Sequence, residues 1–172
     1  MKALAAALLV SVAACGEGKA VFNVDVLSFL SASDSTKAYT IPIIGTVDST
    51  ISRNFRLPPG FGGSSVDSVA ATVAASLENS AGSGTVILAV FFAKTQGGLF
   101  TGTPYLSDTA TVAGAQTVPL GKNVVSLADT VFNTDSLWVG IRARISTTVA
   151  PMTGQLRFTD IRLRIVVQDQ IL

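Results

Sequence analysis

The feature that most constrains this chain is a repeated alternation of apolar and polar residues with a period of two. It is clearest in "VDSVAATVAASLENSAGSGTVILAVFF", in which Val69, Val73 and Leu77 fall on the same parity. Successive side chains of a β-strand point to opposite faces, so this pattern predicts strands with one buried face. Glycine, serine, asparagine and proline punctuate the apolar runs and supply turns. The sequence therefore predicts an all-β protein, an antiparallel β-sandwich of jelly-roll type with about eight strands.

The predicted strands cover residues 20–30, 37–45, 46–57, 67–78, 84–94, 110–119, 136–149 and 155–168. The turn "ENSAGSG" predicts a hairpin in which Leu77 meets Val86. The run "VILAVFF" has no polar alternation, so Ile87 and Phe91 need cover from a second layer, a partner subunit or a long loop.

The last apolar segment, "LRFTDIRLRIVVQ", changes phase part of the way along. A β-bulge near Thr159 and Asp160 would restore the phase, because one extra residue exchanges the two faces. A hairpin over "APMTG" would place Arg142 opposite Arg162 and Arg144 opposite Asp160. The first of these pairings is unfavourable and the second is favourable.

Two short segments between the strands carry turn signals. In "SLADTVFN", Ser126 is in position to cap a single helical turn, with Asp129 three residues further on. The glycine-rich stretch "PPGFGGSS", from Pro58 to Ser65, lacks the Lys-Ser/Thr ending of a phosphate-binding loop. We expect it to be an ordinary loop between strands.

Composition limits the function. The net charge is +1 and only 13% of residues are charged, against roughly 25% in typical domains, so no basic footprint for nucleic acid exists. The chain has no histidine, which removes the commonest general base and metal ligand. Aspartates fall mostly in turns, and a calcium ion near Asp25 or Asp160 would lack a clustered acidic loop. We expect neither catalysis nor a cofactor or metal.

The N-terminal segment "MKALAAALLVSVAACGEGK" has the architecture of an export signal: a positive start at Lys2, a short apolar run and small residues before the only cysteine, Cys15. The apolar run is shorter than the about 20 residues that a membrane-spanning helix needs. "VAAC" resembles the lipobox of bacterial lipoproteins, which implies lipidation of Cys15. Gly16 rather than aspartate follows, which by the same resemblance implies the outer membrane. The alternative is an ordinary signal cut after Ala14, leaving a free thiol.

These features divide the chain into a lipoprotein signal peptide (1–14), a lipidated tether (15–19) and one β-sandwich domain (20–172). The expected location is the cell envelope, with a lipid anchor in the outer membrane. A short helix before the strand "SLWVGIRARI", followed by an apolar last strand, resembles the carbohydrate-binding jelly-roll modules of the DNRLRE type over residues 50–168. That resemblance carries over no ligand-binding residue, because the tryptophan expected after the short helix is not placed here.

The candidate ligand face joins an aromatic residue to four cations: Trp138, Arg142, Arg144, Arg162 and Arg164. Such a face suits stacking on a sugar ring or holding an anionic glycan. The plainer interpretation is the solvated side of an amphipathic sheet. We therefore expect a non-catalytic exported lipoprotein that binds a glycan or protein partner or has a structural role. The alternative is a carbohydrate-binding accessory module or a degenerate carbohydrate-active enzyme.

Overall fold

The structure is a computed structural model that describes residues 18–56, 65–127, 129–132, 134 and 136–169. In these ranges seven strands form one antiparallel sheet: β1 (Gly18–Asp25), β2 (Thr36–Ile41), β3 (Gly45–Arg56), β4 (Ser65–Ala93), β5 (Leu106–Ala113), β6 (Gln116–Leu127) and β7 (Ser136–Asp169). The helical segments are short: η1 (Leu27–Phe29), α2 (Ala32–Ser35), η3 (Gln96–Gly98) and η4 (Thr130–Phe132). The all-β prediction is confirmed.

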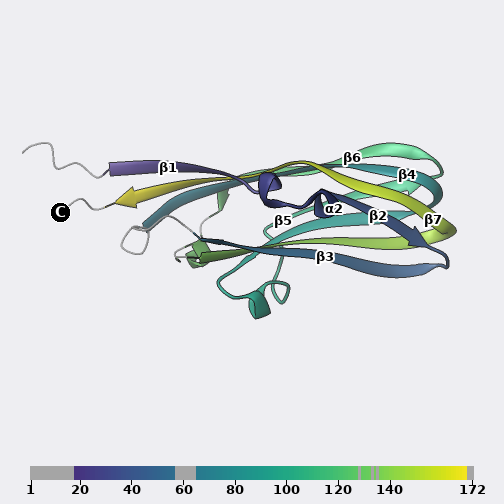
Figure 1. Ribbon diagram of the computed structural model, residues 1–172, viewed down its shortest axis with the longest axis horizontal. Helices are drawn as coiled ribbons and strands as arrows, with labels where there is room; N and C mark the ends of the chain where they lie inside the picture. Colours follow the sequence, from purple (N-terminus) through teal and green to yellow (C-terminus); the bar gives the residue numbers. More distant parts are fainter. Residues whose placement is uncertain (1–17, 57–64, 128, 133, 135, 170–172) are drawn as a thin grey trace, which may run out of the picture.

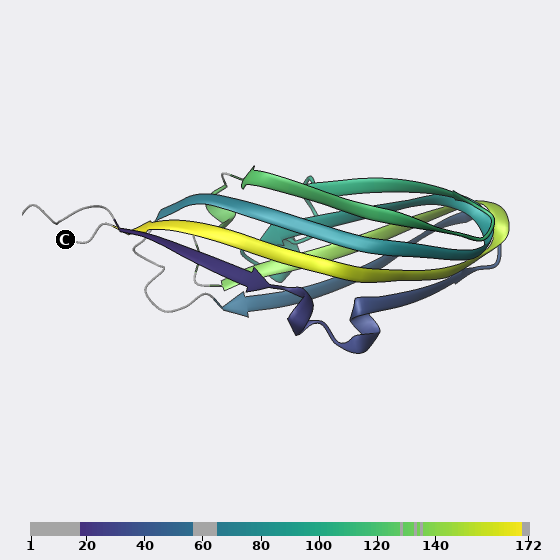
Figure 2. The same ribbon diagram turned by 90° about the horizontal axis from the view of Figure 1, so that it is seen from above.

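The sheet is folded into two layers because β4 and β7 both bend back at the same end of the molecule (Figure 1 and Figure 2). Residues 65–79 of β4 pair with residues 154–168 of β7, and residues 83–93 pair with residues 138–149. The first pair is flanked by β6 on one side and by β1 and β2 on the other, and we call this the β6 layer. The second pair is flanked by β5 and β3, and we call it the β5 layer.

The hydrophobic core lies between the two layers. Alternate residues of β4 supply its centre, and the expected inward face of this strand is confirmed: Val69, Ala71, Val73, Ala75, Leu77, Val86, Leu88, Val90 and Phe92 are all buried. Alternation decides this face because one residue of slippage would expose the whole set.

The predicted hairpin within β4 is wrong, although both of its members are buried. Leu77 pairs with Leu156 and Val118, whereas Val86 pairs with Ile145 on the opposite layer. The turn after Leu77 therefore carries the chain from one layer to the other. Alternation specifies which face of a strand is apolar but not which strand becomes its neighbour.

The bulge predicted in the last segment is confirmed. Ala74 pairs with Asp160 and the next residue, Ala75, pairs with Phe158, so Thr159 is the extra residue of β7. The extra residue lets the apolar positions before and after it face the same core.

The single strand expected at 110–119 is wrong, because this segment is divided between β5 and β6. The chain reverses at Gly114, which has a φ of 72° and donates its amide to the carbonyl of Gly82. Only glycine adopts this left-handed conformation without steric cost. The neighbours of Gly114 are both alanine, so no polar turn residue marked the reversal in the sequence.

The helical turn near "SLADTVFN" exists, but it begins later than expected, because Ser126 still belongs to β6. The Asp129 carboxylate accepts a hydrogen bond from the Val131 amide at 2.9 Å and begins η4. Most of the loop from Pro58 to Ser65 falls outside the described residues, and Ser65 begins β4.

A long loop covers the outer side of the β5 layer. Phe91 is 1% exposed and packs with Leu99 of the loop between β4 and β5, beside Phe100 and Trp138. Of the three forms of cover expected for Phe91, the structure shows the loop. Ile87 remains half-buried.

Candidate functional site

Cys15, the expected lipidation site, lies outside the described residues, which begin at Gly18. Gly18 pairs with Asp169, so the start of β1 and the end of β7 meet at the end of the molecule opposite the β4 and β7 bends (Figure 1). Across the described ranges, none of the helices has the length and apolar character needed to cross a bilayer.

The structure does not bring the five residues of the expected ligand face together. Trp138, Arg142 and Arg144 belong to the β5 layer, and Arg162 and Arg164 belong to the β6 layer. The expected pairing of Arg142 with Arg162 is wrong, because Arg142 pairs with Thr50 and Ala89. All five side chains alternate with buried neighbours, so each points to the outer side of its own layer.

Trp138 and Arg142 support the loop that covers the β5 layer. Trp138 is half-buried against the cluster of Phe91 and Leu99. The guanidinium carbon of Arg142 lies 4.7 Å from the centre of the Phe91 ring, a cation–π arrangement. The ring of Trp138 therefore packs within the protein rather than offering an open platform to a sugar.

Arg144 makes a bidentate ion pair on the same side of the molecule. Its Nε and Nη2 donate to Oδ1 and Oδ2 of Asp48 at 2.8 and 2.9 Å. These hydrogen bonds hold the pKa of the Asp48 carboxyl below its usual value. Both side chains are exposed, so we expect the pair to contribute little to stability.

The two arginines of the β6 layer differ in their partners. Arg162 donates from Nε and Nη2 to both carboxylate oxygens of Asp160, at 2.7 and 2.5 Å. Arg164, two residues further along β7, makes no ion pair or side-chain hydrogen bond with the part of the chain that the structure describes. Its guanidinium is therefore available to an anion from solution.

A hollow of about 490 Å³ lies on the outer side of the β6 layer. Its polar lining comes from four neighbouring strands: Asn23 and Asp25 of β1, Thr72 of β4, Asn123 of β6, and Arg162 and Arg164 of β7. We call this set the β6-layer groove. The small side chain of Ala70, which pairs with Arg164, forms part of its floor. Thr72 donates to Asn123 Oδ1 at 3.2 Å and orders the opposite wall.

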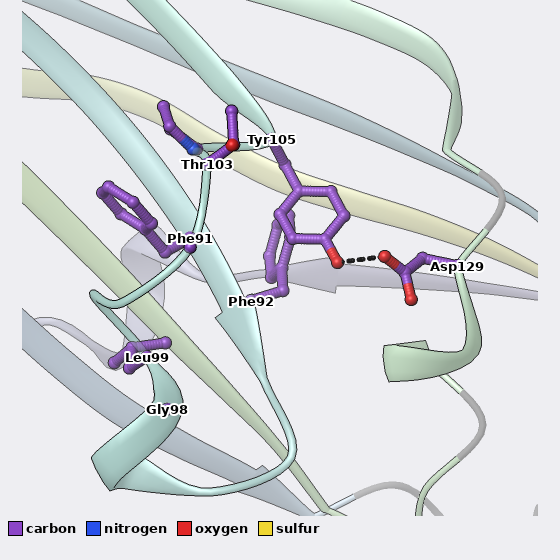
Figure 3. Close-up of a pocket in the computed structure, with 9 residues that line it drawn as sticks. Phe91, Phe92, Gly98, Leu99, Thr103, Tyr105 and Asp129 are labelled. Carbon is purple, nitrogen blue, oxygen red and sulfur yellow. Dashed lines mark hydrogen bonds between the residues drawn. The ribbon is translucent and has the colours of Figure 1, made fainter.

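A second hollow, of about 400 Å³, lies where the loop between β4 and β5 meets the segment before η4 (Figure 3). Tyr105 points across it and donates a short hydrogen bond to Asp129. Phe92, Tyr105 and Phe132 form a cluster with ring centres 5.3 to 5.9 Å apart. Leu99 lies on the other side of the hollow.

We call this second hollow the Tyr105 cleft. The hydrogen bonds within it stabilise a negative charge on Asp129. The hydrogen bond from Tyr105, followed by that from the Val131 amide, lowers the pKa of Asp129. Burial, followed by the hydrogen bond to Asp129, raises the pKa of Tyr105 to about 12. Asp129 is the one carboxylate among the lining residues. The cleft thus offers a hydroxyl and a carboxylate but no acid and base pair.

Metal ligands do not gather in the described part of the chain, where no group of three acidic, histidine or cysteine side chains could hold an ion. Asp160, one of the two aspartates considered for calcium, is paired with Arg162. Asp25 accepts a hydrogen bond from the amide of Ser28 at 3.3 Å.

Sequence reasoning found Arg162 and Arg164 but missed most of their surroundings. Asn23, Thr72 and Asn123 come from strands distant in sequence, and no pattern joins them. Tyr105 and Asp129 are separated by 24 positions, and neither carries a local signal beyond its turn context.

No family model matches the sequence, and no curated protein is similar enough to count as a relative. Similar solved structures include a chain from the infectious bursal disease virus Gx strain, with a TM-score of 0.42, 12% identity, and coverage of 90% of this chain and 38% of that one. TmCBM61, solved with β-1,4-galactotriose, has a TM-score of 0.35, 9% identity and coverage of 86% of both chains. Dimeric latent PorU from Porphyromonas gingivalis has a TM-score of 0.36 and 11% identity, with 89% of this chain and 13% of that chain covered. Similarity at this level assigns neither a ligand nor an activity.

Proposed function

We propose that this chain is a non-catalytic binding module of the cell envelope, held by an acyl anchor at Cys15, and that it binds an anionic glycan in the β6-layer groove. The observation that carries the proposal is Arg164, which faces a polar hollow and has no hydrogen-bond acceptor among the residues that the structure describes. Arginine is suited to this role because its planar guanidinium binds a carboxylate or sulfate through two parallel hydrogen bonds.

The shape of the groove fits a sugar ring better than it fits a small anion alone. Ala70 leaves room above the sheet, while Asn23, Thr72 and Asn123 supply amide and hydroxyl groups around that room. These groups can hydrogen-bond sugar hydroxyls and Arg164 can hold the acidic substituent. The Arg162–Asp160 pair orients the neighbouring guanidinium and reduces the net charge of the groove. A neutral sugar would leave Arg164 without its acceptor.

Two features support a non-catalytic role. Glycoside hydrolysis uses a pair of carboxylates about 5 to 9.5 Å apart, one of which acts as the acid. Asp129 is the one carboxylate that lines the Tyr105 cleft. The hydrogen bond from Tyr105 lowers the pKa of Asp129 and so favours its ionised form, which cannot act as the acid. In the β6-layer groove, Asp25 is the one carboxylate among the lining residues. The chain has no histidine to act as a base elsewhere.

Two observations support the proposed acyl anchor: the lipobox-like "VAAC" and the start of β1 at Gly18, three residues after Cys15. Each acyl methylene contributes about 0.8 kcal/mol in the bilayer, and stable attachment takes two chains. Intact-mass analysis of the protein from membranes of a bacterial host should find Cys15 acylated, and a Cys15→Ser variant should lack the acyl mass. An unmodified Cys15 in a soluble mature chain would contradict this part of the proposal.

The ligand is tested by isothermal titration with polygalacturonate, a uronate polymer, and with galactan, an uncharged galactose polymer. We expect polygalacturonate to bind and neutral galactan not to bind. Arg164→Ala should weaken binding roughly 10- to 100-fold, because a hydrogen bond to a charged group contributes about 1.5 to 3 kcal/mol. Binding should also weaken as salt is added.

Arg144→Ala is the matched control, since Arg144 is an exposed arginine on the opposite layer. It should leave the affinity unchanged. Equal loss in the two variants would show general charge attraction instead of a site. Binding of galactan as tight as that of polygalacturonate would refute the anionic ligand, and turnover of either polymer would refute the non-catalytic role.

A further inference from the structure

The end of the molecule formed by the β4 and β7 bends exposes large apolar side chains. Ile43 and Ile44, between β2 and β3, are 71% and 69% exposed. Val47 and Val149 are 49% and 55% exposed. Over the described residues, six large hydrophobic side chains are exposed, and four of them are at this end. We call Ile43, Ile44, Val47 and Val149 the apolar end.

The apolar end is one surface because its segments are paired. Gly45 pairs with Thr147, so the β2–β3 turn lies beside the β7 bend. Ser83 pairs with both Val149 and Ala113, which brings the β4 bend and the β5–β6 turn to the same place. Figure 1 and Figure 2 show these turns together at the end opposite β1.

This end also lacks charge. The chain has 12 basic and 11 acidic residues, 23 in all. None of them falls in the segments that form this end, which are residues 38–47, 79–93, 109–121 and 145–156. Two of the first charged groups along the strands have partners: Asp48 binds Arg144, and Glu78 accepts a hydrogen bond from Gln155 at 2.6 Å. Threonine, serine, glycine and proline are frequent in these segments, beside apolar residues.

We propose that the apolar end inserts into the interfacial region of a lipid bilayer. A stable protein interface engages roughly 20 to 30 residues on each side, and the four side chains of the apolar end do not supply such an area. Interfacial insertion needs much less, because apolar side chains that project from a turn enter the bilayer separately and their contributions add. The absence of charge favours the bilayer over water-filled surroundings, since charged groups are costly to move into lipid.

The insertion does not depend on the acyl anchor. Gly18 and Asp169 lie at the other end, so a chain anchored at Cys15 presents the apolar end to a lipid surface away from the anchor. Contact there would be weak and reversible, because its strength scales with the apolar area that is buried.

The test uses the full chain with Cys15→Ser, which removes acylation, and vesicles of pure phosphatidylcholine, which remove net charge attraction. Trp138 is the one tryptophan, so Trp138→Phe gives a background without tryptophan fluorescence. In that background Ile44→Trp places a reporter at the apolar end. Asn54→Trp places the control at an exposed site of β3, paired with position 138. A local reporter is needed because the apolar N-terminal segment also binds vesicles.

With vesicles, the emission of the Ile44→Trp protein should shift to shorter wavelength, and brominated phosphatidylcholine should quench it several-fold more than that of the Asn54→Trp protein. Ile43→Ser with Ile44→Ser should lower the vesicle-bound fraction relative to the Cys15→Ser chain. Equal quenching at the two positions, or no shift at position 44, would overturn the proposal. Self-association in the absence of vesicles that the double variant abolishes would also overturn it, in favour of a contact between copies.

Discussion

The Tyr39 hydroxyl donates a 2.8 Å hydrogen bond to Oδ1 of Asn79 at the point where the sheet folds from one layer to the other. Nδ2 of Asn79 donates to the carbonyls of Gly82 and Gly114 at 3.0 and 2.6 Å. Asn79 is 5% exposed, so this one buried amide joins β2, the β4 bend and the β5–β6 turn. Buried polar groups of this kind are costly to leave without partners.

Replacement of Asn79 by leucine should lower the free energy of unfolding by about 2 kcal/mol, because the Gly114 carbonyl and the Tyr39 hydroxyl lose their partner and the Gly82 carbonyl keeps only the Gly114 amide. Urea denaturation followed by circular dichroism gives the change. Tyr39→Phe is the control: it removes one hydrogen bond and should cost about 1 kcal/mol. Equal losses in the two variants would show that the amide donors of Asn79 contribute nothing.

The chain has two tyrosines, and both should titrate late in the folded protein. Burial is the main cause that raises the pKa of Tyr39 to about 12, and burial with the Asp129 hydrogen bond does the same for Tyr105. The pKa is higher in the folded state, so the resulting stability is complete below pH 10.0, the unfolded value, and is lost as pH rises toward about 12. Tyrosinate absorbance should therefore develop near pH 12 in the native protein and near pH 10 in urea. A native midpoint near the unfolded value would contradict the burial of these hydroxyls.

Gly140 should tolerate no side chain. A Cβ there would lie 2.7 Å from Cδ2 of Leu99 and 2.8 Å from Cε1 of Phe100, and Leu99 is 1% exposed. Gly140→Ala should cost about 1 to 3 kcal/mol by displacing the loop that covers Phe91. In Gly45→Ala, by contrast, the Cβ meets no atom within 4 Å, and the stability should change by about 0.5 kcal/mol or less. Thermal unfolding of the two variants makes the comparison, and equal melting temperatures would contradict the loop contact.

Amide exchange should be slowest at residues 69–77 and 86–92 of β4. Residues 69–77 pair with β7 and β6, and residues 86–90 pair with β7 and β5. Central strands of this kind open only with global unfolding, whereas an edge strand such as β3 opens locally. Hydrogen exchange with mass spectrometry should therefore rank β4 below β3 in rate. Faster exchange in β4 would contradict its central position.

The fold was predictable in class because one rule governs most of the chain. The larger apolar side chains between Val69 and Leu77 share one face of the strand, and exposing that face to water is unfavourable. The bulge at Thr159 followed from the same rule, since the change of phase had to be compensated. The reversal at Gly114 escaped prediction because it depends on one left-handed glycine between alanines, with no polar turn residue beside it.

The residues of the candidate site could be predicted only in part from local sequence patterns. Arg162 and Arg164 stood out as cations on an outward face, but Trp138, Arg142 and Arg144 had the same pattern and lie on the other layer. A period of two in polarity indicates which side of a strand faces outward, but it does not indicate the layer to which the strand belongs.

The sequence by itself determined that the chain forms strands, which side of each strand is buried, and that histidine-based chemistry is absent. These properties follow from side-chain polarity along a single strand and from composition. Only the tertiary structure decided that β4 and β7 cross between layers, that Arg164 faces Ala70 and Asn23 in a hollow, and that the apolar turns meet at one end. The physical reason is that strand pairing brings together residues distant in sequence, and the hydrogen bonds that select each neighbour join backbone groups that every residue carries.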